Sequence, residues 1–149
     1  MSEKVLTVAA RGLLVAIFLG SAVGKIVQRS ETIEKMSEAG VPVPSVLIWG
    51  AIAFLLAGGI SVLLGAYTKI GSTLLMVFLA LATFYFHDFW NDAADSPEWL
   101  LNFIGFQKNL GLFGALLFLF VNGPGPGSLD LRERVIVPGQ VEPLAPEHA

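Results

Sequence analysis

The sequence predicts an all-α integral membrane protein that folds as a four-helix bundle with up-down topology. Hydrophobic residues make up 54% of the 149 residues, and charged residues make up only 14%. A soluble domain carries about 25% charged residues, and the mean hydropathy here is +0.71. Such a chain lacks the polar side chains to cover a folded surface, so we expect it to lie in the lipid bilayer.

Four apolar segments are long enough to cross a bilayer, which takes about 20 residues per helix. We expect the spans at about 7–27, 45–66, 70–90 and 97–122, all in one membrane domain over residues 1–130, with a polar cytoplasmic tail over 131–149. The fourth span must begin well before Lys108, because only about 15 residues separate Lys108 from Asn122. Ser96 and Pro97 suit an N-cap and a first helical turn. A break near Gly105 is the alternative.

The link after the first span contains "SETIEKMSEAG". Ser30 is expected to cap a short helix there, and Gly40 to end it. Ile33 and Met36 share one face of this helix, and the charged residues mostly lie elsewhere. The pattern predicts a short helix that lies on the membrane surface.

Charge indicates where the ends of the chain lie and which partners are excluded. Four spans place both termini on one side, and a small excess of Lys and Arg on that side predicts cytoplasmic termini. The net charge is −3 without a basic block, so we expect no nucleic-acid partner. The absence of cysteine excludes disulfides and thiolate metal sites. The sequence has no haem or nucleotide-binding motif, so we do not expect a stand-alone catalyst.

The stretch "FYFHDFWND" places ionisable groups at the rim of the third span. From the cytoplasmic boundary, Lys25 and His87 rise about 27 Å and Lys108 about 21 Å, in a hydrocarbon layer about 30 Å thick. Charged groups at such depth usually face the bundle interior. We therefore predict a polar ligand pocket near the outer face, formed by Lys25, His87, Trp90, Lys108 and Asn109. The alternatives are an aromatic-belt role for Trp90, a snorkelling Lys25 and a structural hydrogen bond from His87. No metal site is expected.

Small residues predict where helices pack closely. They recur every fourth position in the first span and form pairs in the second and fourth: Gly12, Ala16, Gly20, Gly24, Gly58, Gly59, Gly111 and Gly114. Packing within the bundle is favoured over a dimer face. Arg11 lies about one turn inside the cytoplasmic edge, where it either snorkels, pairs with carbonyls that end the fourth span, or pairs with Asp130.

Six pieces of the chain together resemble the DoxX family of small bacterial and archaeal membrane proteins. They are "RGLLVAIFLGSAVGK", "GVPVP", "GGISVLLGAYTK", "FHDFW", "KNLGLFGALL" and "GPGPGSLD", in this order. The resemblance implies a multi-pass four-helix bundle in the cytoplasmic (inner) membrane. It carries over Arg11, Lys25, His87, Lys108 and Asn109 as positions of the family pattern. Family members often have a glutamate shortly before the paired glycines, where this chain has Leu55.

The family's contexts, terminal oxidases and thiosulfate:quinone oxidoreductases, imply a redox-linked role. We expect a membrane subunit or anchor of a quinone-linked oxidoreductase, of respiratory or thiosulfate type. Its pocket would hold a quinone head or a small sulfur-containing substrate, and a membrane or peripheral redox protein is the expected partner. Two alternatives stay open. One is a non-catalytic accessory subunit on a larger membrane complex, and the other is a small-solute transporter that acts as a homo-oligomer.

Overall fold

The computed structural model describes residues 2–94 and 96–130, so the predicted tail lies outside the described residues. Helices alone make up the regular structure of these two ranges. They are α1 (Glu3–Val27), α2 (Arg29–Glu38), α3 (Pro44–Leu64), α4 (Thr68–Phe86), the short 3-10 helix η1 (Phe89–Asn91) and α5 (Pro97–Asn122).

Four helical segments are long and apolar enough to cross a membrane: Glu3–Val27, Pro44–Leu64, Thr68–Asn91 and Pro97–Asn122. The prediction of an all-α, four-span protein is therefore confirmed. The fourth span begins where its cap was predicted, because the Ser96 hydroxyl accepts a hydrogen bond from the Trp99 N–H at 3.1 Å. Since α5 is continuous, the alternative of a break near Gly105 is wrong.

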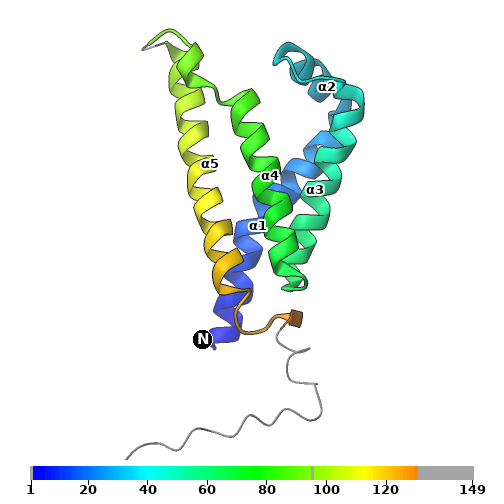
Figure 1. Ribbon diagram of the computed structural model, residues 1–149, viewed down its shortest axis with the longest axis vertical. Helices are drawn as coiled ribbons and strands as arrows, with labels where there is room; N and C mark the ends of the chain where they lie inside the picture. Colours follow the sequence, from blue (N-terminus) through cyan, green and yellow to red (C-terminus); the bar gives the residue numbers. More distant parts are fainter. Residues whose placement is uncertain (1, 95, 131–149) are drawn as a thin grey trace, which may run out of the picture.

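Each central helix packs between two neighbours. Helix α3 packs against α1 and α4, and α4 packs against α3 and α5. The core joins all four spans through these buried side chains: Val15, Phe18, Ala22, Leu55, Val62, Leu75, Leu79 and Leu116. We call the two ends of the bundle the Arg11 end and the Lys25 end. Figure 1 shows that α4 and α5 diverge from α2 and α3 toward the Lys25 end, which is uppermost in that view.

Helix α2 corrects two expectations about the first link. It begins at Arg29 after Gln28, so Ser30 lies inside the helix and is not its cap. Met36 is buried against Ile48 and Ile52 of α3, and the Val41 N–H donates to the Met36 carbonyl at 2.9 Å. The apolar face of α2 therefore meets protein where contact with the membrane surface was expected, because the short link folds α2 back onto α3.

The paired glycines of α3 lie at close helix contacts. A Cβ atom at Gly58 would lie 2.9 Å from the Gly71 carbonyl oxygen of α4. A Cβ atom at Gly59 would lie 2.6 Å from Leu19 Cδ2 of α1. Glycine therefore allows α3 to approach both of its neighbours closely.

Most of the other small residues do not pack this way, which corrects the prediction of packing within the bundle. Cβ atoms at Gly20, Gly24, Gly111 and Gly114 would meet no heavy atom within 4 Å, and Ala16 is exposed. A Cβ atom at Gly12 would lie 3.9 Å from Leu63 Cδ1, which is an ordinary van der Waals contact. The reason is the rotation of α1 about its own axis. Helix α1 turns the face with Val15 and Phe18 toward the core, so the small-residue stripe faces partly outward.

Candidate functional site

A pocket of about 210 Å³ lies between α1, α4 and α5 toward the Lys25 end. Lys25, His87, Lys108 and Asn109 all line it, together with Ser21 and apolar side chains, and we call it the polar pocket. Trp90 does not line it. Its lining includes no carboxylate, so this space combines two ammonium groups, an imidazole and an amide from three different helices.

Lys25 is held on the bundle side of α1. Its Nζ donates to the Ser21 hydroxyl at 3.1 Å and lies 5.6 Å from the centre of the Phe78 ring of α4. Within the described ranges the one ion pair joins Lys35 to Glu31 on α2, at 2.6 Å. The Lys25 charge is therefore balanced by a hydroxyl dipole and a ring face, without a carboxylate.

His87 follows the last turn of α4, and its backbone N–H donates a hydrogen bond to the Thr83 carbonyl at 3.0 Å. The imidazole packs directly on the backbone of α5 at Gly105, where a Cβ atom would collide with Nδ1. By distance and angle, this buried Nδ1 has no hydrogen-bond partner among the described residues. An unsatisfied buried nitrogen is costly, and the Asn102 side chain of α5 is near enough to interact with the ring.

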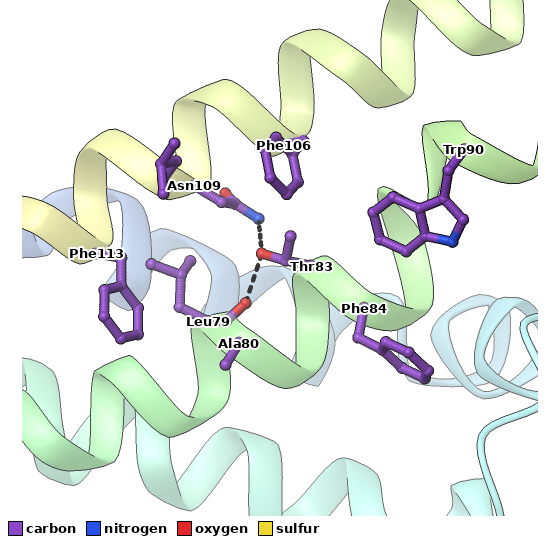
Figure 2. Close-up of a pocket in the computed structure, with 9 residues that line it drawn as sticks. Leu79, Ala80, Thr83, Phe84, Trp90, Phe106, Asn109 and Phe113 are labelled. Atoms are coloured by element: carbon purple, nitrogen blue, oxygen red, sulfur yellow. Dashed lines mark hydrogen bonds between the residues drawn. The ribbon is translucent and has the colours of Figure 1, made fainter.

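Asn109 joins α5 to α4 and separates the polar pocket from a second one. Its side chain is buried, and Nδ2 donates to the Thr83 hydroxyl at 2.9 Å. That hydroxyl donates in turn to the Leu79 carbonyl at 2.7 Å (Figure 2). Lys108 precedes Asn109, is exposed, and lies close enough to His87 for their charges to interact.

Trp90 lies in the second pocket, also of about 210 Å³, which we call the aromatic pocket (Figure 2). Its lining is Leu79, Ala80, Thr83, Phe84, Trp90, Phe106, Asn109, Leu110 and Phe113. Trp90 is 51% exposed, and its ring contacts Phe89 and Phe106 edge to face. Phe89 also contacts Trp99 and Phe103. These rings hold η1 on α5, and that contact fixes the position of the adjoining His87.

Arg11 and Asp130 lie together at the opposite end of the bundle. Arg11 is buried, and its Nη2 donates to the Gly127 carbonyl at 3.0 Å. The acceptor lies five residues beyond the end of α5 at Asn122, so this contact is not with the carbonyls that end the fourth span, which was one of the alternatives open from sequence. Arg11 also interacts electrostatically with Asp130, which contacts the start of α4. These two residues therefore organise the Arg11 end and are remote from the polar pocket.

Several residues of the site were not predicted from sequence. Ser21 precedes Lys25 by one helical turn, so its hydrogen bond could have been found from spacing alone. Phe78 and Gly105 gave no such signal, because their roles depend on which faces of α4 and α5 meet. Leu55, at the position of the family's glutamate, is fully buried in the apolar core. No charged partner is needed at that position here.

The fold and the pocket define a small multi-pass helical membrane protein with a cationic cavity at one end. The chain belongs to the DoxX family, whose model matches residues 6–88, more than half of the chain. It is 32% identical to inner membrane protein YphA of Escherichia coli strain K12 over 132 residues, and this alignment covers 88% of this chain and 92% of that protein. It is also 30% identical over 128 residues to inner membrane protein YqjF of the same organism, covering 86% and 92%. No solved structure matches the chain closely enough to count as a relative. The protein is thus a DoxX-family inner membrane protein.

Proposed function

We propose that this protein is a membrane subunit or anchor of a quinone-linked oxidoreductase and that the polar pocket holds the quinone head. The observation that carries the proposal is the meeting of Lys25, His87, Lys108 and Asn109 in one pocket lined by no carboxylate. A quinone offers two carbonyl acceptors and takes up electrons and protons. Every polar group needed to bind such an acceptor is a donor, and these four side chains supply donors.

The donor set also suits the charge that reduction of a quinone creates. The Lys25 and Lys108 ammonium groups favour negative charge on a carbonyl oxygen, and the half-buried Lys25 does so more strongly than the exposed Lys108. His87 lines the pocket with an imidazole, a side chain that can both donate a hydrogen bond and exchange a proton. The hydrogen bond to Thr83 fixes the orientation of the Asn109 amide, so this group is already positioned at the edge of the pocket.

Binding of a benzoquinone without a tail to the full chain in lipid nanodiscs tests the proposal. His87→Ala and Lys108→Ala are each expected to weaken binding about tenfold or more, since a hydrogen bond to a charged group contributes about 1.5–3 kcal/mol. Lys69→Ala is the matched control, because Lys69 also lies near an aromatic ring, 5.8 Å from the centre of Phe120, but lines no part of the pocket. Unchanged binding in both pocket variants would exclude the polar pocket as the quinone site.

The proposed subunit role requires a partner and an orientation. We propose cytoplasmic termini, with the Lys25 end toward the outer face of the membrane. Gentle extraction of native membranes, followed by mass spectrometry of the copurifying proteins and lipids, is expected to recover a redox protein and a quinone with this chain. Recovery with phospholipid alone would contradict a role as a subunit.

A further inference from the structure

We infer that the quinone is a tailed lipid quinone whose tail runs from the polar pocket, past Lys25, into a larger apolar cavity that opens to the bilayer between α3 and α4. This inference rests on the proposed function and adds to it the class of quinone and its route. The cavity has a volume of about 480 Å³ and lies between α1, α2, α3 and α4. We call it the tail cavity.

The tail cavity and the polar pocket share a wall. Lys25, Phe78, Ala82 and Phe86 line both spaces. The shared wall is the contact between α1 and α4, and within the described ranges no side-chain hydrogen bond joins these two helices there. The polar contact that spans this wall is that of the Lys25 ammonium with the Phe78 ring, whose centre lies 5.6 Å away. A molecule with its head on the His87 side of Lys25 can therefore extend its tail to the other side by displacing this contact, without breaking a hydrogen bond.

The walls of the tail cavity suit a hydrocarbon chain. Leu47, Phe54 and Leu81 are among the side chains that line it, and its polar members are confined to the Lys25 end of the bundle. Leu47 on α3 is 42% exposed and Leu81 on α4 is 55% exposed. Since these are lipid-facing spans, the cavity reaches the bilayer between them, and a tail can enter or leave laterally.

The aromatic pocket offers a second exit, and two observations count against it. It shares only Leu79 and Asn109 with the polar pocket, and its volume is less than half that of the tail cavity. The hydrogen bond from Asn109 to Thr83, at 2.9 Å, crosses this contact between α5 and α4. A tail on this side would have to break a bond that is buried in the membrane.

Photolabelling tests the route. A benzoquinone with a diazirine near the start of an alkyl tail is bound to the full chain in nanodiscs, irradiated, and mapped by mass spectrometry. Label is expected on Leu47, Phe54 and Leu81, and excess unlabelled tailed quinone is expected to abolish it. Label on Phe84 or Leu110 would assign the tail to the aromatic pocket and overturn the inference. Label that the quinone does not displace would also overturn it, since ordinary lipid would then occupy the cavity.

A cavity-filling variant separates the tail from the head. Gly50 lines the tail cavity, and a Cβ atom there would meet nothing within 4 Å, so a longer side chain can leave the α3 backbone at this position without a collision at its first atom. Gly50→Leu is expected to abolish the displaceable label on α3, while the quinone without a tail binds as it does to the parent chain. Gly111→Leu is the matched control, because Gly111 has the same open surroundings but lines none of the three pockets.

The two hypotheses fail differently. If the quinone without a tail does not bind the parent chain, the proposed function is wrong, and the tail route is wrong with it. If that quinone binds but Gly50→Leu leaves the labelling of α3 unchanged, only the tail route is wrong.

Discussion

The carboxylate of Asp130 accepts hydrogen bonds from both the backbone N–H and the hydroxyl of Thr68, at 3.0 Å and 2.7 Å, although 62 residues separate the two. It also accepts the N–H of Tyr67 at 2.7 Å. The segment after α5 thus returns across the Arg11 end and caps the N-terminus of α4, where a negative charge is favoured by the helix dipole.

Removal of this cap is expected to destabilise the bundle. Asp130→Ala should lower the free energy of unfolding by about 1–2 kcal/mol, because N-terminal N–H groups of α4 lose their acceptor. Titration with SDS in mixed micelles measures this free energy. Glu34→Ala, which removes a carboxylate from the exposed face of α2, should change it by less than about 0.5 kcal/mol. Equal effects of the two substitutions would mean that Asp130 acts only through net charge.

Tyr67 occupies the left-handed region, with φ 51° and ψ 40°, immediately before α4. Asparagine tolerates this conformation better than other residues with a side chain. Tyr67→Asn should therefore be more stable than Tyr67→Ala by about 0.5–1 kcal/mol. Because both variants remove the ring, the comparison isolates the backbone conformation. Thermal unfolding in detergent gives the difference, and equal stabilities would show that the backbone at Tyr67 relaxes without cost.

Gly105 provides the space that the His87 imidazole occupies against α5. Gly105→Ala should displace the ring and change the NMR signals of its two nitrogens, recorded in a His148→Gln background in which His87 is the only histidine. Gly111→Ala, on the same helix with open surroundings, should leave those signals in place and stabilise the helix by up to about 1 kcal/mol. Unshifted signals in Gly105→Ala would show that the ring does not rest on this glycine.

Three glycine-to-alanine substitutions should differ in their effect on the free energy of unfolding, because the space around each glycine differs. Gly58→Ala should cost about 1–3 kcal/mol, because its Cβ would meet the Gly71 carbonyl, which cannot rotate away. Gly59→Ala should cost less, since only the flexible Leu19 side chain lies there. Gly20→Ala should be neutral or stabilising by up to about 1 kcal/mol. The unfolding free energies of the three variants check this order, and a reversal would contradict the observed helix faces.

The hydrogen bond between Asn109 and Thr83 should appear as a coupling energy. In a double-mutant cycle with Asn109→Leu and Thr83→Val, we expect a coupling of about 0.6 kcal/mol, the average for side-chain hydrogen bonds within a membrane protein. The cycle cancels the separate effects of each substitution on packing. A coupling of zero would mean that the two side chains do not bond in the membrane.

The sequence by itself determined the four spans and the heights of the polar groups along them. A bilayer of fixed thickness sets the length of each helix, and a constant rise per residue sets how far each side chain lies from its end. From that arithmetic, Lys25, His87 and Lys108 were expected near one end, and the structure places them in one pocket. Nothing in this reasoning required knowledge of which helices are neighbours.

Only the tertiary structure decided which faces of the helices meet. It selected Gly58 and Gly59 for close contact and left Gly20 and Gly111 open, although all four carry the same small-residue signal. It also brought Asp130 to the start of α4. The rotation of a helix about its axis depends on the side chains of its neighbours, and those come from distant parts of the chain. Spacing along one helix fixes height but leaves rotation undetermined, because every turn repeats the same rise whichever face is turned inward.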